Sequence, residues 1–309
     1  MNDAPRIAPT AGSVRDALGG ATDALRAAGV ESPRLDAELL LCEATGWERA
    51  RLAADPDAGL PPAAGRRFGE MVRRRLRREP VAYILGSKWF REIELAVDRR
   101  VLIPRPETEL LVEVAVELAP RRVLDIGTGS GAIALAIAAE IPGCAVTATD
   151  NSPGALEVAR ANAERLGLAT RVTFVEGTLP SGTDTPERFD LVVANLPYVA
   201  EADWPELQPE VTEWEPREAL LAGPDGLDAY RRLLGHPAST GRTSLHIATP
   251  SASTTHGRTV ALEIGEGQAP AVAGMLGEAG FLEVETRRDL AGIERVVIGR
   301  APSVGEPEG

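Results

Sequence analysis

The sequence has few of the residues that mark disulfide frameworks, metal centres or membrane spans. Its 309 residues contain two cysteines, Cys42 and Cys144, which lie far apart and lack metal-ligand spacing, so we interpret both as reduced packing residues. No apolar run reaches about 18 residues, and the opening MNDAPRIAPT lacks the apolar stretch of a secretory signal. We therefore expect a cytoplasmic protein that uses no metal and contacts no membrane.

Basic charge is scarce as well. Lysine and arginine together number 33 against 46 acidic residues, the formal net charge is -13, and Lys88 is the one lysine. This balance argues against a protein that holds nucleic acid mainly by electrostatic attraction, and we expect no direct nucleic-acid binding. The dense basic run from Arg73 to Arg78 is typical of a solvated helix face, although such a run can also contact a phosphate backbone.

The remaining composition is that of an ordinary globular protein long enough for two domains, with 44% hydrophobic and 26% charged residues. Apolar residues recur at helical spacing between residues 12 and 79, and short runs beyond them, such as residues 81–86, suit strands. We predict an N-terminal helical domain (1–79), a β-hairpin linker (80–103), an α/β domain (104–301) and a flexible tail (302–309).

Strands and helices alternate from residue 121 onward, which predicts a Rossmann-like α/β fold with a seven-stranded sheet. The expected strands are residues 123–126, 145–148, 172–175, 191–194, 260–264, 282–285 and 295–298. The expected helices are residues 110–118, 132–139, 153–166 and 269–279, with one more ending at Leu234. Residues 281–300 leave no room for a crossover helix, so the last strand should run antiparallel to its neighbours.

A glycine turn follows the first of these strands, in the pattern D-x-G-x-G-x-G from Asp125 to Gly131. Such a turn between a strand and a helix lets a ligand approach the backbone closely. Asp150 ends the next strand, where its carboxylate can accept hydrogen bonds from both hydroxyls of a ribose. The glycine spacing differs from the G-x-G-x-x-G of dinucleotide-binding turns and disfavours a nicotinamide dehydrogenase. The pattern is similar to the S-adenosylmethionine turn of Rossmann-like methyltransferases.

The stretch Asp190–Tyr198, DLVVANLPY, reads as a buried strand that Pro197 terminates. The carboxyl ends of strands in open α/β sheets are where ligands bind. There, the Asn195 side-chain oxygen and a neighbouring backbone carbonyl can accept hydrogen bonds from the two N–H groups of a planar nitrogen. Held in this way, the nitrogen directs its lone pair towards an incoming methyl group, and Tyr198 can stack on the planar group. A plain turn that ends a strand is the alternative interpretation.

A second unusual stretch is Ile103–Glu109, IPRPETE, ahead of an apolar helix. Its two prolines hold the backbone extended, and Glu107 or Glu109 falls in the first helical turn, where the helix dipole favours an acid. The residues fit a simple helix cap, and they equally fit a site in which Arg105 and the acids lie beside a ligand.

Taken together, these stretches resemble the protein-(glutamine-N5) methyltransferases that modify the Gly-Gly-Gln loop of class-one peptide chain release factors. The resemblance covers nearly the whole chain, and Pro104–Glu109 is its most specific part. The matching stretches are residues 79–86, 102–109, 125–131, 195–198, 215–217, 226–228 and 289–292, with Arg295.

The resemblance implies transfer of a methyl group from S-adenosylmethionine, which leaves as S-adenosylhomocysteine, to the glutamine amide nitrogen of the release factor. The implied cofactor-binding residues are Gly127, Thr128, Gly129, Ser130, Gly131, Asp150, Thr178, Leu179 and Asn195. The implied substrate-binding residues are Asn195, Leu196, Pro197, Tyr198, Arg105 and Glu107, with Asn195, Pro197 and Tyr198 as the catalytic group. It further implies that the helical domain docks the release factor, and we expect a monomer.

The sequence departs from this family in three places. Leu196 stands where the family usually has proline, and N-L-P-Y also occurs in ribosomal-RNA adenine methyltransferases. Thr178 stands where an acid is common. Residues 235–258, which hold all three histidines of the chain, replace a short turn and strand, and we interpret them as a flexible surface insertion.

Three alternatives to a release-factor methyltransferase follow from these observations. One is a glutamine methyltransferase of a ribosomal protein, which shares the same frame. Another is an N6-adenine methyltransferase that acts on a flipped base, which the acidic composition disfavours. The last is a cofactor-binding scaffold without activity, which the intact N-L-P-Y disfavours.

Overall fold

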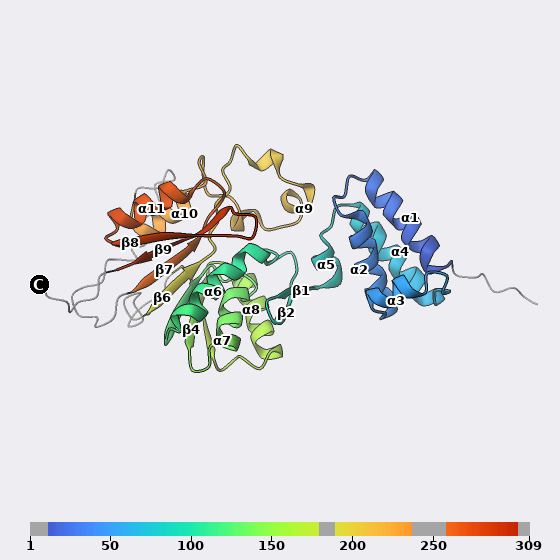
Figure 1. Cartoon of the computed structure of the whole chain (residues 1–309), viewed down its shortest axis with the longest axis horizontal. Helices are drawn as coiled ribbons and strands as arrows, with labels where there is room; N and C mark the ends of the chain where they lie inside the picture. The colour runs from blue at the N-terminus through green and yellow to red at the C-terminus, as the bar shows by residue number, and fades with distance from the viewer. Residues whose placement is uncertain (1–11, 179–188, 237–257, 302–309) are drawn as a thin grey trace, which may run out of the picture. The chain divides into compact units, whose positions relative to one another are not determined.

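The computed structural model describes residues 12–178, 189–236 and 258–301 (Figure 1). The chain divides into two compact units, Met1–Gly86 and Ser87–Gly309. The boundary between the units falls inside the stretch 80–103 that the sequence assigned to a linker. Among the described residues, no helix combines the length and the apolarity needed to cross a membrane.

The first unit consists of helices whose apolar faces share one core. Its helices are α1 (Val14–Ala27), α2 (Pro33–Thr45), α3 (Arg49–Ala54), α4 (Pro62–Leu76) and α5 (Val81–Leu85). Ser13 and Asp16 form a reciprocal capping box at the start of α1, and Pro33 and Pro62 occupy the first turns of α2 and α4. The sequence did not predict α3, because its six residues include a single buried side chain, Leu52, and give no periodicity.

The stretch at residues 81–86, which we expected to be extended, is the helix α5, so this part of the hairpin prediction is wrong. Pro80 precedes the helix, and Gly86, with a φ of 76°, ends it in the left-handed region. The neighbouring side chains of Tyr83 and Ile84 are both buried. A strand would point them to opposite faces, whereas successive side chains of a helix are only about 100° apart, so both can be buried along one side of the turn.

The basic run at the end of α4 is largely used within the first unit. Arg74 donates to the carboxylate of Glu79 at 2.6 and 2.8 Å, and the buried Arg75 donates to Asp36 at 2.7 Å. Arg78 donates to two backbone carbonyls that follow α1. Three of the five arginines in the run therefore hold the unit together, which leaves little of it to contact a phosphate backbone.

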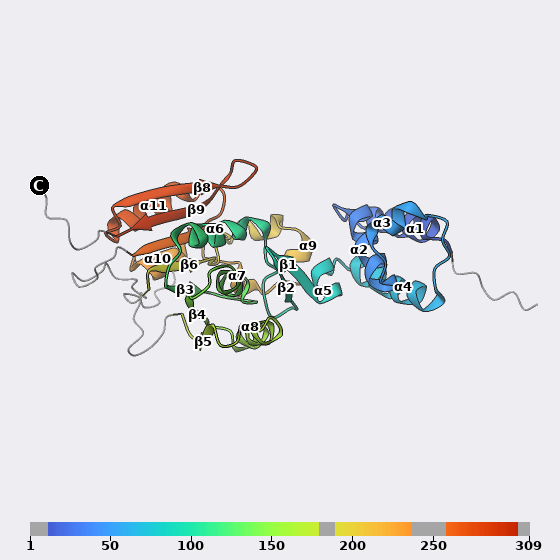
Figure 2. The same ribbon diagram turned by 60° about the horizontal axis from the view of Figure 1, so that its bottom comes forward.

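The second unit is built on a seven-stranded sheet in the order β5-β4-β3-β6-β7-β9-β8, which Figure 2 shows from bottom to top. The strands are β3 (Arg122–Ile126), β4 (Ala145–Asp150), β5 (Val172–Glu176), β6 (Leu191–Ala194), β7 (Thr259–Glu263), β8 (Glu283–Arg288) and β9 (Glu294–Arg300). The last strand, β9, is antiparallel to both β7 and β8, and β3 to β7 are mutually parallel. The Rossmann-like fold class and the antiparallel last strand are thereby confirmed.

Helices cover both faces of the sheet (Figure 1). Helices α6 (Glu109–Leu118) and α7 (Ala132–Glu140) contribute to the core on one face, and α8 (Pro153–Arg165) closes it through Ala163. Helices α10 (Asp228–Leu234) and α11 (Ala269–Glu278) contribute to the core on the other face. Because each strand of the centre is covered on both sides, Leu191–Ala194 is completely buried.

Shorter elements complete the unit. Strands β1 (Ser87–Phe90) and β2 (Ile93–Ala96) form an antiparallel hairpin, which α8 holds through Asn162: its side chain bonds both the N–H and the carbonyl of Ala96, at 2.7 and 3.0 Å. The remaining described elements are η1 (Pro106–Thr108), η3 (Trp204–Glu206), α9 (Pro209–Thr212) and η4 (Arg217–Ala219).

Candidate active site

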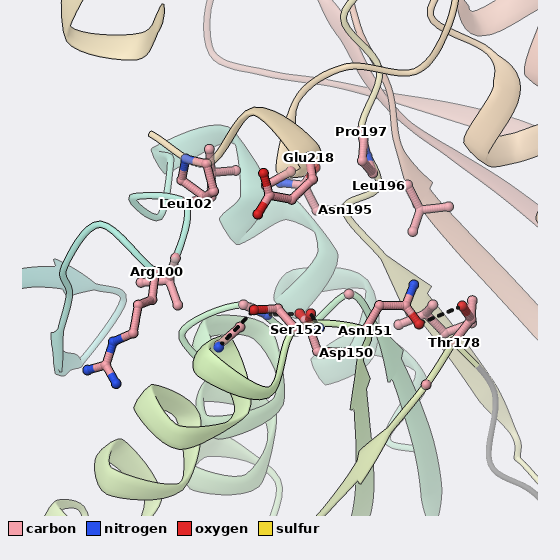
Figure 3. Close-up of a pocket in the computed structure, with 18 residues that line it drawn as sticks. Arg100, Leu102, Asp150, Asn151, Ser152, Thr178, Asn195, Leu196, Pro197 and Glu218 are labelled. Carbon is pink, nitrogen blue, oxygen red and sulfur yellow. Dashed lines mark hydrogen bonds between the residues drawn. The ribbon is translucent and has the colours of Figure 1, made fainter. Parts of the chain in front are cut away.

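A cavity of about 390 Å³ opens at the carboxyl ends of β3, β4 and β6. These strands are neighbours because β3 is hydrogen-bonded to β4 on one side and to β6 on the other, although 40 residues of chain separate β4 from β6. Figure 3 shows Asp150, Asn151 and Thr178 along one rim, and Asn195, Leu196 and Glu218 along the opposite rim. The fold thus brings the two stretches that the sequence singled out to one hollow.

The glycine turn after β3 forms the floor between the rims. Its three glycines all have a positive φ, of 76° at Gly127, 56° at Gly129 and 84° at Gly131. A Cβ on Gly131 would meet Leu135 Cδ1 at 2.9 Å and Ala159 Cβ at 3.3 Å, so the packing adds to the preference for glycine that the positive φ sets. Of the five turn residues, Gly127 and Gly129 line the cavity, and Thr128 and Ser130 are buried beneath it. The surface offered to a ligand is therefore mostly backbone.

Asp150, at the end of β4, is fixed by the backbone on both sides. One carboxylate oxygen accepts from Gly129 N at 2.9 Å, and the other accepts from Ser152 N at 2.8 Å. Each carboxylate oxygen has a second lone pair. Asp150 therefore reaches the cavity with its orientation set and with acceptor capacity left for the two hydroxyls of a diol.

A second carboxyl, Asp125, lies behind the turn and is fully buried. Burial raises its pKa to about 7, and the charge of Asp150 adds to this, whereas a hydrogen bond from Thr128 at 2.6 Å works in the opposite direction. Asp125 does not line the cavity. It braces the turn from beneath through Thr128.

The far end of the cavity lies between β4 and β5. Thr178 donates from its hydroxyl to Asn151 Oδ1 at 3.1 Å, and its carbonyl accepts from the Thr149 hydroxyl at 2.9 Å. Thr178 lines the cavity, as expected, and so do Asn151 and Ser152, which sequence reasoning missed even though they directly follow Asp150. Leu179, the other residue expected here, lies outside the described residues.

Asn195 follows β6 and is oriented by the stretch that precedes α6. Its Nδ2 donates to the hydroxyl oxygen of Thr108 at 3.0 Å, and Thr108 is 3% exposed. The amide oxygen of Asn195 is therefore the end that is left for a ligand. Thr108 belongs to the Pro-Arg-Pro-Glu-Thr-Glu stretch, so the two unusual motifs of the sequence meet at this hydrogen bond.

The residues that follow Asn195 divide between two environments. Leu196 and Pro197 line the cavity. Tyr198 lies beyond it, where burial raises its pKa to about 12, so the phenol stays protonated at neutral pH. Its backbone is held by Gln268, whose Nε2 donates to the Tyr198 carbonyl at 3.0 Å while Oε1 accepts from Gly265 N at 3.0 Å. Gln268 was not singled out in the sequence.

Arg105 and Glu107 do not line the cavity. Arg105 Nη2 lies 2.5 Å from Glu215 Oε1, and Glu215 Oε2 accepts from Ile103 N at 3.1 Å. Arg105 thus joins its stretch to the segment before η4. Glu107 is half-buried and lies within electrostatic range of Tyr198 and Arg295.

Sequence reasoning also missed several residues of the cavity wall. Arg100, Val101, Leu102, Pro216, Glu218 and Ala219 line it. In Figure 3 the Glu218 side chain reaches over the cavity, whereas the Arg100 guanidinium points away from it, towards Asp98 and Glu157. Leu102 and Pro216 belong to the stretches 102–109 and 215–217 that carry the resemblance, and the other four directly flank these stretches.

Two family models match the chain. A model described as a methyltransferase domain matches residues 123–214, which contain nearly all of β3, the strands β4 to β6, the glycine turn and Asn195. A model described as the PrmC N-terminal domain matches residues 16–86, which is the helical unit. The fold and the matched residues define the second unit as a Rossmann-like methyltransferase domain.

Relatives of known name match over nearly the full length. The release factor glutamine methyltransferase of Geobacter sulfurreducens is 43% identical, over 94% of this chain and 98% of the relative. The one of Xylella fastidiosa is 44% identical, over 90% of this chain and 98% of the relative. The chain belongs to the release factor glutamine methyltransferases. The family that the sequence resembled is thereby confirmed, and with it the class of enzyme.

A solved structure supports the fold in addition. The catalytic domain of hMettl16, in complex with a hairpin of the MAT2A 3′ untranslated region, superposes with a TM-score of 0.53, over 73% of this chain and 82% of that one. The two sequences are 17% identical, so this likeness concerns the architecture of the domain and not its substrate.

Proposed function

We propose that this protein transfers a methyl group from S-adenosylmethionine to the side-chain amide nitrogen of the glutamine in the Gly-Gly-Gln motif of class-one peptide chain release factors. The observation that carries the proposal is the hydrogen bond from Asn195 Nδ2 to Thr108, which points the amide oxygen of Asn195 to the rim of the cavity. The names of the full-length relatives supply the choice of substrate.

The residues around the cavity suit S-adenosylmethionine. The exposed backbone of Gly127 and Gly129 leaves room for the methionine half, and the fixed carboxylate of Asp150 has acceptors for the ribose hydroxyls. Thr178 and Asn151 lie where the adenine would extend from that ribose. The cofactor carries its methyl group on a sulfonium sulfur, which is a leaving group that needs no metal.

The chemistry requires the glutamine nitrogen to become a better nucleophile. An amide lone pair is delocalised into the carbonyl, and acceptors for both N–H groups hold the nitrogen so that the lone pair faces the methyl carbon. Asn195 Oδ1 is one such acceptor, and a backbone carbonyl of the Asn195–Pro197 turn is the second. The new C–N bond forms as the S–C bond breaks, S-adenosylhomocysteine leaves, and the nitrogen loses one proton to water. Tyr198 packs on the planar amide.

Positioning and electrostatics supply the rate in this mechanism. In this proposal Asn195, Pro197 and Tyr198 form the catalytic group, and Leu196 replaces the usual proline without loss because that position acts through its carbonyl. Arg105 serves the substrate indirectly, through its ion pair with Glu215. The N-terminal helical domain (1–79) docks the release factor, and the enzyme acts as a cytoplasmic monomer.

Methyl transfer from radiolabelled S-adenosylmethionine tests the proposal. The substrates are a class-one release factor, the same factor with its Gly-Gly-Gln glutamine changed to alanine, ribosomal protein and ribosomal RNA, each offered separately. We expect label on the intact factor alone. Label on ribosomal protein or RNA in its place would reassign the substrate.

The Asn195→Ala variant tests the site itself. We expect it to lose turnover by at least about a hundredfold, because it lacks the acceptor that orients the nucleophile, and to keep its affinity for S-adenosylmethionine in calorimetric titration. Full activity in this variant would refute the proposed site.

A further inference from the structure

A buried carboxylate, Glu263, lies behind the pair Asn195 and Thr108. It ends β7, and the register pairs Ala194 with Leu262, so Glu263 stands beside Asn195 on the neighbouring strand. Glu263 is 1% exposed, and the Thr108 hydroxyl lies close enough to its carboxyl group to lower the pKa of Glu263, as a hydrogen-bond donor does. Within the described part of the chain, its Oε2 has no hydrogen-bond partner. An acid so deeply buried is costly, and the mechanism above does not use it.

The three side chains lie in the order that a hydrogen-bond relay requires, and elementary chemistry sets the direction of such a relay. An ionised carboxylate only accepts hydrogen bonds, so the single proton of the Thr108 hydroxyl must point to Glu263. The Thr108 oxygen is then left as an acceptor, and the Asn195 group that satisfies it is the NH₂. If the Asn195 amide were turned over, its oxygen would face the Thr108 oxygen with no proton between them.

We propose that Thr108 and Glu263 are positioning residues that hold the Asn195 amide in the one orientation that presents its oxygen to the substrate. The inference rests on the proposed function, and it assigns a role in catalysis to Thr108 and Glu263, neither of which lines the cavity. Without the relay, the Asn195 side chain could present either its oxygen or its NH₂ group, and an NH₂ group would repel the N–H donors of the glutamine.

The relay works only while Glu263 is ionised. Burial raises its pKa to about 7, and the negative charge of Glu107 acts in the same direction, whereas Thr108, Arg105 and Arg295 counteract them. The titratable and charged groups that face Glu263 are Arg105, Glu107, Tyr198, Tyr230 and Arg295. A protonated Glu263 can donate to Thr108 instead, which releases the Thr108 proton towards Asn195 and favours the wrong orientation of the amide.

Three variants test the relay. Thr108→Val removes the hydroxyl and keeps the shape, Thr108→Ser keeps the hydroxyl, and Glu263→Gln replaces the obligate acceptor by a group that can also donate. We expect Thr108→Val and Glu263→Gln to lower kcat by at least about tenfold, with unchanged affinity for S-adenosylmethionine, and Thr108→Ser to stay within about threefold of the parent. The kcat of the parent should rise with pH through about 7, and Glu263→Gln should lose this rise.

The orientation of the amide has its own signature. The sequence has four asparagines, Asn2, Asn151, Asn162 and Asn195, so protein labelled with ¹⁵N-asparagine gives four side-chain NH₂ signals. Each NH₂ group gives a pair of proton signals, and the pair that disappears in Asn195→Ala belongs to Asn195. We expect that pair to move in Thr108→Val and Glu263→Gln and to keep its position in Thr108→Ser.

Each outcome decides between the two proposals. Parental kcat in Thr108→Val, a loss that serine does not restore, or a loss of cofactor affinity in place of kcat would overturn the relay. If Asn195→Ala is inactive while Thr108→Val is fully active, the relay fails and the proposed function stands. If Asn195→Ala is itself fully active, the proposed function fails first.

Discussion

Arg105 and Glu215 stand 110 positions apart in the chain and form an ion pair with 2.5 Å between Nη2 and Oε1. The side chain of Glu215 is 2% exposed, and its second oxygen accepts from the backbone N–H of Ile103. One buried carboxylate therefore fastens both the arginine and the backbone of the stretch that carries Thr108. Through it, the segment before η4 and the stretch before α6 are held at the same edge of the sheet.

Removing this carboxylate should loosen the site and the fold together. We expect Glu215→Ala to lower the free energy of unfolding by about 3 kcal/mol, because it leaves the Arg105 guanidinium and the Ile103 N–H without their acceptor. Glu215→Gln, which keeps an acceptor for Ile103, should lose less. Thermal unfolding of both variants checks the order, and an alanine variant that unfolds at the parental temperature would show that the pair contributes nothing.

Asp150 should control cofactor affinity. Changing it to alanine removes the acceptors proposed for the ribose and also leaves Gly129 N and Ser152 N unpaired. We expect the Kd for S-adenosylmethionine to rise at least about tenfold in calorimetric titration. Glu176 is the matched control, because it is the register partner of Asp150 on β5 and does not line the cavity. Equal losses in Asp150→Ala and Glu176→Ala would contradict the assignment.

A methyl group at Gly226 should displace Tyr198. A Cβ there would meet the Tyr198 carbonyl oxygen at 2.3 Å and the Gln268 amide nitrogen at 2.8 Å. Gly267 has a similar positive φ, of 79° against 74°, and open space around its Cβ position. We expect Gly226→Ala to lose about 2 to 4 kcal/mol of stability and most of its kcat, and Gly267→Ala to lose about 1 kcal/mol with normal kcat. Similar effects at both positions would mean that backbone strain, and not the contact with Tyr198, decides the outcome.

The buried acid of the relay should destabilise the fold at alkaline pH. The pKa of Glu263 is raised from 4.5 to about 7, so between these values the folded state holds a proton that the unfolded state has lost. The free energy of unfolding therefore falls as pH rises through this window, by a total on the order of 3 kcal/mol for this group.

The Glu263→Gln variant isolates that contribution, because glutamine stays neutral at every pH. We expect its thermal midpoint to exceed that of the parent at pH 8 and the excess to shrink towards pH 5. Asp125, whose pKa is also raised to about 7, adds a slope of the same sign to both proteins and cancels in the comparison. A difference that does not vary with pH would refute the expectation.

Local patterns in the sequence predicted the parts of the fold that depend on neighbours along the chain. The strand Leu191–Ala194 has the expected bounds, because an apolar run that ends at Pro197 leaves no other choice. The glycine turn and Asp150 lie at one cavity, because each ends a strand that pairs with the other in parallel. The stretch 81–86 was misassigned, because apolar residues next to one another fit a strand as well as one turn of a buried helix.

The contacts that orient the site could not be predicted in the same way. Thr108 meets Asn195 across 87 positions, and Gln268 meets Tyr198 across 70. From the sequence alone, Glu263 is simply part of the strand predicted over residues 260–264. Only the register between β6 and β7 places it beside Asn195. Such contacts depend on which strands become neighbours and on how they are aligned, and no local spacing encodes either.

The position of β9 between β7 and β8 has a consequence for solubility. Strands β8 and β9 form an antiparallel hairpin, and β9, although it comes second in the chain, is the strand that pairs with β7. The hairpin must therefore dock onto the sheet through β9. Until it does, β7 is the edge of the parallel sheet and presents an unpaired row of backbone groups along the apolar residues 260–262. Substitutions that weaken the hairpin, far from the cavity, are therefore the ones that would lead this enzyme to aggregate during refolding.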